Sequence, residues 1–137
     1  MLLVAVIRNV KSAFFSPDGM HIVSTFDDEI ACIWISATGK CEKELIHSSP
    51  VNWAAFSPDG MHIVSACNDQ IAQIWNTITG ECETVMRHKN PVNYALFSPD
   101  NMHIVSTSDD FTVWIWNTVT GGCEAELKGH TDSVDIL

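Results

Sequence analysis

The sequence predicts an all-β chain made of three consecutive copies of one antiparallel unit, and three observations support this prediction. The segment from Phe15 to Ser24 returns unchanged at Phe56 to Ser65, and it returns with one change at Phe97 to Ser106. Short segments rich in apolar and β-branched residues alternate with turn sequences inside each copy. Tryptophan recurs with the same step of 41 residues, at Trp34, Trp75 and Trp116.

The third copy shows the four strands of the unit in order. Val92 to Phe97 is mostly apolar and is followed by a turn sequence. His103 to Thr107 is rich in β-branched residues, and Thr112 to Trp116 alternates with the two-residue period of a strand. Cys123 to Leu127 completes the unit. Four antiparallel strands in a period of about 40 residues are typical of a propeller blade. The predicted fold class is therefore a partial β-propeller of three four-stranded blades.

The repeats occupy approximately residues 6–46, 47–87 and 88–128, and residues 129–137 match the start of a further repeat. Met1 to Ala5 aligns with the outer strand of a preceding unit, so we expect an extra strand at each end of a single partial domain over 1–137. A closed propeller has about four to eight blades. Three interpretations follow: a fragment of a longer propeller protein, which the sequence favours, a ring closed by homo-oligomerisation, or an open arc.

Composition limits the classes of partner. The chain carries 17 acidic and 7 basic residues, with a formal net charge of -10. Binding to nucleic acid or to an anionic membrane depends on clustered Lys and Arg, so neither partner is expected. No apolar run approaches the roughly 20 residues of a membrane-spanning helix. The five cysteines are an odd number without paired spacing, which favours a reducing, cytoplasmic location.

Several short motifs resemble those of the WD-repeat family. They are the turn Ser-Pro-Asp-Gly, the strand ending Ile-Trp-Asn followed by Thr-Gly, and the pair Gly129-His130. The resemblance covers nearly the whole chain. The closing dipeptide departs from the family name, because it reads Trp34-Ile35, Trp75-Asn76 and Trp116-Asn117.

The resemblance implies a buried, hydrogen-bonded tetrad of His, Ser, Asp and Trp in each blade. The indole N–H needs an acceptor, a hydroxyl can accept it, and a histidine can link that hydroxyl to a carboxylate. We expect these groups to hold the fold and not to act as a catalytic triad. In the first copy the histidine position holds Val6. The expected sets are His47, Ser65, Asp69 and Trp75; His88, Ser106, Asp110 and Trp116; and Ser24, Asp28 and Trp34.

The resemblance also implies that one rim carries the partner-binding residues. In each copy these are the start of the inner strand and the residue before the tetrad aspartate. Trp53 and Tyr94 are the most informative candidates, since aromatic residues with a polar tip dominate binding hot spots; the alternative is that they pack between blades. The candidates are Asn52, Trp53, Asn93, Tyr94, Asn68 and Asp109, with Lys11, Ser12 and Asp27 at the same positions of the first copy.

Two further repeated residue types have simple structural interpretations. His21, His62 and His103 recur once per copy, but equivalent positions on stacked sheets lie about 10 Å apart and cannot share one metal ion. The same separation forbids disulfides among the repeated cysteines. We expect all five cysteines to be buried, inert thiols. The repeated cysteines are Cys41, Cys82 and Cys123.

The function that these observations favour is a non-catalytic scaffold that binds a protein or peptide. We expect no catalytic residue, no cofactor and no metal. An enzyme with an active site at the rim of the central pore is the alternative, and it would need acids, bases or ligands that break the repeat symmetry. A gene remnant without independent function is a third interpretation.

Overall fold

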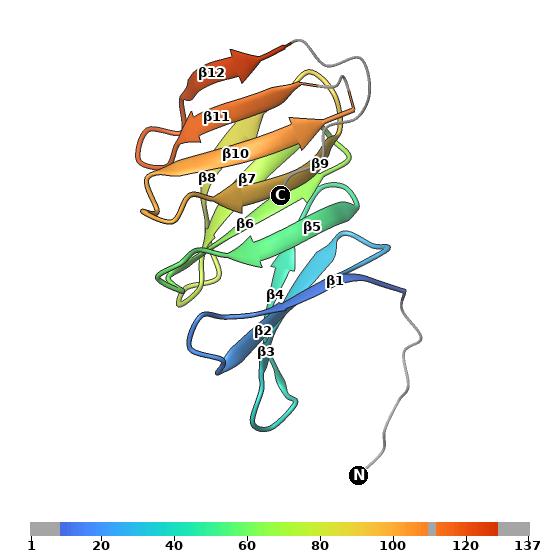
Figure 1. Ribbon diagram of the computed structural model, residues 1–137. Coiled ribbons are helices and arrows are strands. Elements are labelled where there is room, and N and C mark those ends of the chain that lie inside the picture. Colours follow the sequence, from blue (N-terminus) through green and yellow to red (C-terminus); the bar gives the residue numbers. More distant parts are fainter. Residues whose placement is uncertain (1–8, 110–111, 129–137) are drawn as a thin grey trace.

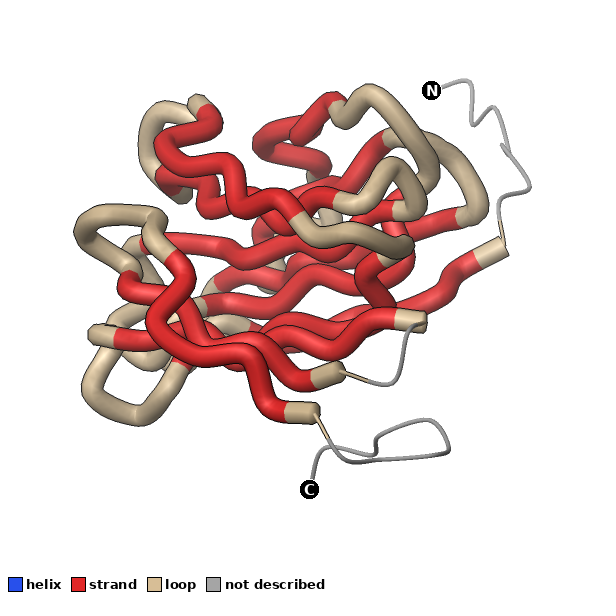
Figure 2. Tube along the Cα trace, turned by 90° about the horizontal axis from the view of Figure 1, so that it is seen from above, coloured by secondary structure: helices blue, strands red, loops and turns tan. Residues whose placement is uncertain are grey.

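Three antiparallel sheets of four strands each make up the computed structural model, which describes residues 9–109 and 112–128 (Figure 1). This confirms the predicted fold class within the described residues, where every regular element is a strand (Figure 2). The extra strand expected at each end falls on residues 1–8 and 129–137, outside the described residues. No helix in the described part of the chain is long and apolar enough to cross a membrane.

Each sheet corresponds to one sequence repeat and is called a blade. Blade 1 contains β1 (Val10–Phe15), β2 (His21–Phe26), β3 (Ile30–Ile35) and β4 (Cys41–Ile46). Blade 2 contains β5 (Val51–Phe56), β6 (His62–Cys67), β7 (Ile71–Asn76) and β8 (Cys82–Arg87). Blade 3 contains β9 (Val92–Phe97), β10 (His103–Ser108), β11 (Val113–Asn117) and β12 (Cys123–Leu127).

Strands that follow each other along the chain pair within each blade, so every blade is an antiparallel meander. The register repeats as well, since Ser24 lies opposite Cys32, Ser65 opposite Gln73 and Ser106 opposite Trp114. The first strands β1, β5 and β9 are neighbours in chain order (Figure 1). Equivalent residues of the three copies therefore come to lie in rows along the molecule.

The repeated Ser-Pro-Asp-Gly sequence forms the turn between the first and second strands of a blade. In blade 1, Ser16 Oγ donates to Asp18 Oδ1 at 2.6 Å and accepts from the His21 backbone N–H at 3.0 Å. Gly19 closes the turn with φ +73°, in the left-handed region that favours glycine. Asn101 takes the equivalent place in blade 3 with φ +63°, which Asn tolerates better than most residues.

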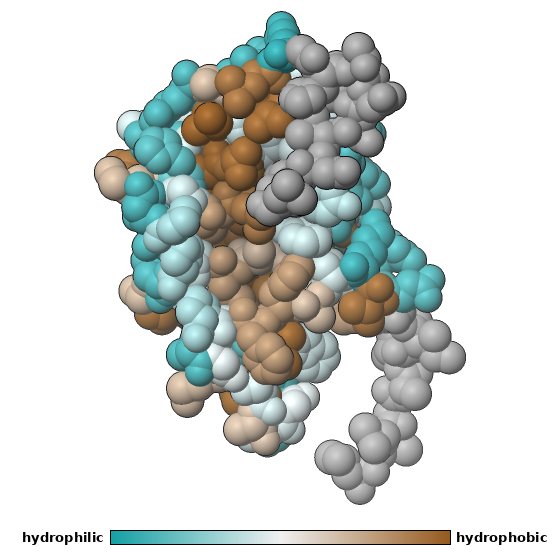
Figure 3. Space-filling model, in the orientation of Figure 1, coloured by the Kyte–Doolittle hydropathy of each residue, from teal (hydrophilic) through white to brown (hydrophobic). Residues whose placement is uncertain are grey.

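Each blade has two faces, which we name by direction along the chain. The forward face points towards the next blade, and the rear face points towards the preceding one. The forward faces of blades 1 and 2 are covered by the next blade. In Figure 1 blade 3 lies in front of blade 2, and its forward face shows apolar side chains bordered by hydrophilic ones in Figure 3.

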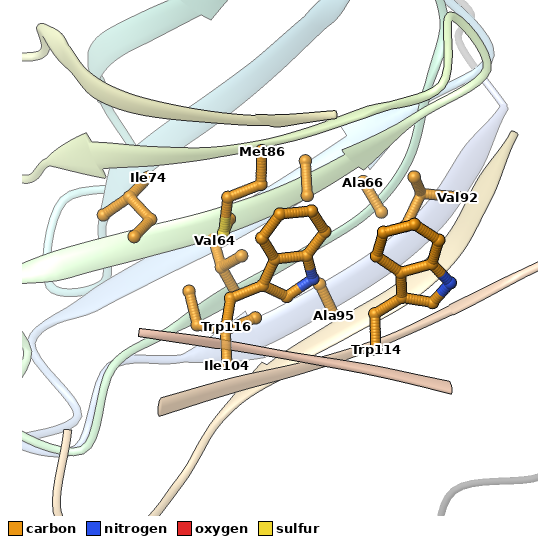
Figure 4. Close-up of a cluster of buried hydrophobic side chains, with 10 residues drawn as sticks. Val64, Ala66, Ile74, Met86, Val92, Ala95, Ile104, Trp114 and Trp116 are labelled. Carbon is orange, nitrogen blue, oxygen red and sulfur yellow. The ribbon is translucent and has the colours of Figure 1, made fainter. Parts of the chain in front are cut away.

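The largest core cluster lies between the forward face of blade 2 and the rear face of blade 3 (Figure 4). Val64 and Met86 of blade 2 are fully buried against Trp114 and Trp116 of blade 3. The two indole rings stack with centroids 5.4 Å apart. Burial of such side chains contributes about 1.5–3 kcal/mol each, so packing between blades is a main source of stability.

Candidate functional site

The hydrogen-bonded network in blade 2 joins three side chains. Trp75 donates its indole N–H to Ser65 Oγ at 2.9 Å, and His47 Nε2 lies 2.8 Å from the same oxygen. His47 Nδ1 lies 2.9 Å from the carbonyl oxygen of Leu45. Ser65 has no exposed surface, and His47 and Trp75 are nearly covered. The network therefore connects β6, β7 and the residue that follows β4.

The geometry determines which tautomer of His47 fits. A carbonyl oxygen can only accept, so Nδ1 must carry the proton that points to Leu45. Nε2 is then the acceptor for the Ser65 hydroxyl, which in turn accepts from Trp75. Every group is satisfied when the imidazole is neutral. Burial accordingly lowers the pKa of His47 below its ordinary value of 6.5, although Asp69 and two backbone groups oppose the shift.

Asp69 makes a different hydrogen bond from the one that the family resemblance implies. The bond from His47 Nδ1 goes to Leu45 and not to a carboxylate oxygen. Asp69 Oδ2 accepts a hydrogen bond from the hydroxyl of Ser48, and Oδ1 is buried without a partner. Asp69 still favours the protonated ring electrostatically. Its contribution to the network of blade 2 is therefore one of charge and not a direct hydrogen bond to histidine.

The other two blades repeat parts of this arrangement. In blade 3, Trp116 donates to Ser106 Oγ at 2.8 Å, and His88 Nε2 lies 2.7 Å from that oxygen. In blade 1, Trp34 donates to Ser24 at 2.8 Å. Asp28 Oδ1 accepts from the backbone N–H of Ile30 at 3.0 Å. The expected member Asp110 lies outside the described residues, as does Val6, which stands at the histidine position of the first copy.

The repeated histidines outside the network each meet a glutamate of the same blade. His62 Nε2 lies 2.8 Å from Glu83 Oε1, and His21 and His103 lie 3.3 Å from Glu42 and Glu124. Within residues 9–109 and 112–128, no cluster of three or more His, Cys, Asp or Glu side chains has the geometry to hold a metal ion. These His–Glu pairs are half-exposed and serve as surface contacts between the second and fourth strands.

The candidate rim residues come together in pairs at one end of the blades. Asn93 Nδ2 donates to Asp109 Oδ1 at 2.8 Å, and Asn52 Nδ2 donates to Asn68 Oδ1 at 2.8 Å. Lys11, at the position of Asn52 and Asn93, makes the corresponding ion pair with Asp27 at 3.8 Å. Each blade thus joins the start of its first strand to the turn after its second strand.

Contacts between blades connect these pairs into one row. Lys11 Nζ donates to Asn52 Oδ1 at 3.3 Å, across from blade 1 to blade 2. Asn52 Nδ2 also donates to the Val92 carbonyl of blade 3 at 3.0 Å. The result is a continuous polar rim of hydrogen-bonding groups, which we call the Asn rim. It comprises Lys11, Asp27, Asn52, Asn68, Asn93 and Asp109.

Aromatic side chains lie directly beside the Asn rim. The rings of Trp53 and Tyr94 meet edge to face with centroids 5.0 Å apart, and Phe14 lies 4.7 Å from Trp53. Tyr94 is 44% exposed. Trp53 packs partly against the core, but its Nε1 is buried without a hydrogen-bond partner. Trp53 therefore packs between blades, as the alternative interpretation expects, whereas Tyr94 faces solvent and is available for binding.

Phe14 belongs to this aromatic cluster although its position in the repeat does not mark it as a candidate. Repeat symmetry aligns Phe14 with Ala55 and Leu96, while Trp53 and Tyr94 align with Ser12. Ser12 is buried and shares a hydrogen bond with Thr25 at 2.6 Å. No sequence signal could place Phe14 beside Trp53, because the contact joins positions that are not equivalent.

The expectation that all cysteines are buried was wrong for the three repeated ones. Cys41, Cys82 and Cys123 are exposed, whereas Cys32 and Cys67 are buried. The exposed cysteines start the fourth strand of each blade, which is the outer edge of the sheet. Burial raises the pKa of the Cys67 thiol to about 12, with a further contribution from the negative charge of Asp69.

The blades and their Trp–Ser bonds together define a repeat protein built from β-propeller blades. The model of the WD domain, G-beta repeat, matches residues 5–34, 39–76 and 80–117. These matches cover most of the sequence, and the chain therefore belongs to the WD40 repeat family.

Solved structures show the same fold. The chain is similar to the structure of U3-55K and to the crystal structure of the RRP9 WD40 repeats, each with a TM-score of 0.87 and 24% sequence identity. In both cases the alignment covers 95% of this chain and 42% of the other chain. The chain thus spans less than half the length of these two structures. No curated protein matches the sequence.

Proposed function

We propose that this chain is a non-catalytic interaction module whose Asn rim and neighbouring aromatic side chains bind an extended segment of a protein partner. The observation that carries the proposal is the contact between Trp53 and Tyr94 beside a row of amide groups. Aromatic side chains with adaptable polar neighbours are characteristic of binding hot spots. A cytoplasmic location is part of this proposal, supported by five cysteines that form no disulfide.

Variation between the copies supports a binding function for this end of the blades. The core positions repeat almost without change, whereas one position beside the Asn rim holds Ser12, Trp53 and Tyr94 in the three copies. Identical residues serve the shared fold, and residues that differ between copies can give an otherwise symmetric surface its specificity. The exposed ring of Tyr94 offers an apolar contact, and its hydroxyl offers a hydrogen bond.

Burial of the network supports a non-catalytic function. A nucleophile must be accessible and near its base. Ser65 and Ser106 lie beside a histidine but have no exposed surface. The hydroxyl hydrogen bonds are already used by tryptophan and histidine. We propose that these residues act in folding, and that the three blades work as part of a larger ring completed by a longer protein or by another chain.

The proposal can be tested with peptides selected from a random library for binding to the purified chain. Affinity for each selected peptide is then measured by isothermal titration calorimetry with the parent and with Tyr94→Ala. Loss of a hot-spot aromatic typically costs about 2 kcal/mol or more, so we expect affinity to fall by about thirtyfold. Asn93→Ala should weaken binding as well.

Met61→Ala provides the matched control. Met61 is also a half-exposed large side chain, but it lies in the turn at the opposite end of the blade. We expect it to leave peptide affinity unchanged. If the peptides bind Tyr94→Ala as tightly as the parent, the Asn rim is not the binding surface and the proposal fails.

A further inference from the structure

The two contacts between blades use residues at equivalent positions of the repeat. At the first contact, the forward face of blade 1 meets the rear face of blade 2; at the second, the forward face of blade 2 meets the rear face of blade 3. The forward positions are Val23, Ala31, Ile33 and Leu45 in blade 1, and Val64, Ala72, Ile74 and Met86 in blade 2. All eight are buried.

The rear faces repeat even more closely. Blade 2 contributes Ala54, Phe56, Ile63 and Trp75, and blade 3 contributes Ala95, Phe97, Ile104 and Trp116. The four residue types are identical in the two blades. Because both halves of the contact recur with the repeat, one interface geometry is used twice within the chain.

Within residues 9–109 and 112–128, one forward face and one rear face have no blade packed against them. The forward face of blade 3 holds Val105, Val113, Ile115 and Leu127, which line an apolar groove. Leu127 is 47% exposed, whereas Leu45 and Met86 at the same position are fully buried. Figure 3 shows this face as a patch of hydrophobic colour.

The rear face of blade 1 is the matching half. It holds Ala13, Phe15, Ile22 and Trp34, the same four residue types as in the two covered rear faces. Phe15 is 66% exposed, and Ala13 is exposed as well. Ala54 and Ala95, the equivalents of Ala13, have no exposed surface.

Three equivalent glycines show how the space beside the rear face of each blade is filled. A Cβ on Gly121 would lie 2.7 Å from Thr84 of the preceding blade, and a Cβ on Gly80 would lie 3.2 Å from Lys43. Gly39 has the same place in blade 1 and the same positive φ, yet nothing lies within 4 Å of its Cβ position. The space that a preceding blade fills at Gly80 and Gly121 is therefore open at Gly39.

We propose that the chain binds a second copy of itself head to tail, with the forward face of blade 3 in one copy covering the rear face of blade 1 in the other. The contact is heterologous, since two different surfaces meet. The small Ala125 of one copy, at the position of Lys43 and Thr84, then lies against Gly39 of the other. Two copies joined at both pairs of faces complete a ring of six blades, within the range of about four to eight that propellers have.

The test uses one variant on each face. Phe15→Glu places a charge on the rear face of blade 1, and Leu127→Glu places one on the forward face of blade 3. Both side chains are exposed in the single chain, so neither change should disturb its fold, which circular dichroism checks. Burying an unpaired charge in the contact is costly, and we expect each variant to weaken self-association at least about tenfold. Mass is measured by light scattering after size exclusion, over a range of concentrations.

Mixing the two variants identifies the geometry of the contact. A mixture still contains one unaltered forward face and one unaltered rear face, on different chains. Head-to-tail binding therefore predicts that the mixture forms dimers at concentrations where neither variant does so alone. Val119→Glu, at an exposed turn position on neither face, is the control and should associate like the parent.

Each result decides the proposal. Dimers or larger species in the parent, monomers in either variant, and dimers in the mixture support it. If the parent stays monomeric at every concentration, the proposal is overturned, and a ring would then have to be completed within a longer protein. A mixture that stays monomeric, or a control that also dissociates, overturns it because another surface then forms the contact. None of these results depends on peptide binding at the Asn rim.

Discussion

Trp75 and Ser65 are joined by a buried hydrogen bond of 2.9 Å between neighbouring strands β7 and β6. The same serine oxygen also lies 2.8 Å from His47 Nε2. A single hydroxyl therefore satisfies an indole donor and an imidazole acceptor at once. The equivalent serine of blade 1, Ser24, accepts a hydrogen bond from Trp34. In blade 2 both an indole and an imidazole depend on the serine hydroxyl, whereas in blade 1 an indole does.

Removing the hydroxyl should cost more in blade 2 than in blade 1. Ser65→Ala leaves two buried groups unsatisfied, at about 1–3 kcal/mol each. We expect its free energy of unfolding to fall by about 2–4 kcal/mol. Ser24→Ala affects Trp34, which is partly exposed and can bond water, and we expect a loss of about 1 kcal/mol. Urea denaturation followed by tryptophan fluorescence measures both, and equal losses would contradict the network described for blade 2.

The buried neutral state of His47 predicts that acid destabilises the fold. Burial lowers the pKa of this imidazole in the native state below the ordinary value of 6.5. The unfolded chain thus binds the proton more readily than the native one. Stability contributed by His47 is present above about pH 6.5 and decreases as the pH falls towards the lowered native pKa.

The measurement for this prediction compares the parent with His47→Gln from pH 7.5 to pH 5. Gln removes the titrating group, so the variant is expected to start less stable but to lose less stability over that interval. Aspartates in the turns do not confuse the comparison, since hydrogen bonds from Ser16 and Ser98 lower the pKa values of Asp18 and Asp100 below 3.8. Identical pH slopes for the two proteins would show that His47 does not sense pH.

The blades could be predicted well because several features that define the strands and turns recur together in each copy. Apolar alternation, turn residues and the Trp–Ser spacing all return with the same step, and each limits the register of the same strands. The structure has these strands with boundaries within one or two residues of the expected ones. The resemblance also placed Asn93 and Asp109 on one rim, and the same two positions are in contact in every blade.

Contacts that do not recur from copy to copy could not be predicted. The rings of Phe14 and Trp53 lie 4.7 Å apart between centroids, but the two residues hold different positions in their repeats, so the repeat does not indicate this contact. The bond from His47 to the Leu45 carbonyl also depends on local backbone geometry. The three repeated cysteines were misjudged because the hydrophobic character of cysteine suggests burial, whereas the fourth strand, which holds them, lies at the edge of the sheet.

Thiol reactivity should divide the five cysteines into two groups. Brief treatment of the folded chain with iodoacetamide should modify Cys41, Cys82 and Cys123, which are exposed, and spare Cys32 and Cys67, which are buried. Burial also raises the pKa of Cys67 to about 12, so almost no reactive thiolate forms there near neutral pH. Peptide mass spectrometry gives the extent of modification at each site. Denaturant should remove the difference, and rapid labelling of Cys67 in the native protein would contradict the buried position of β6.

Two glycines with the same backbone conformation should respond differently to substitution. Gly39 and Gly121 both have φ +72°, so replacement by alanine costs each about 1 kcal/mol in backbone strain. At Gly121 the new methyl group would also lie 2.7 Å from Thr84 Cγ2 in blade 2, whereas at Gly39 it meets nothing. We therefore expect Gly121→Ala to lose at least about 1 kcal/mol more stability than Gly39→Ala.

Urea denaturation of both glycine variants, at concentrations where the chain is monomeric, gives the comparison. A third variant separates the two effects, because Thr84→Ser removes the methyl group that Gly121→Ala would strike. The double variant Thr84→Ser and Gly121→Ala should recover most of the additional loss, since the methyl clash is then gone. If Gly121→Ala is no worse than Gly39→Ala, or if the double variant recovers nothing, blades 2 and 3 do not approach each other at this position as the structure has them.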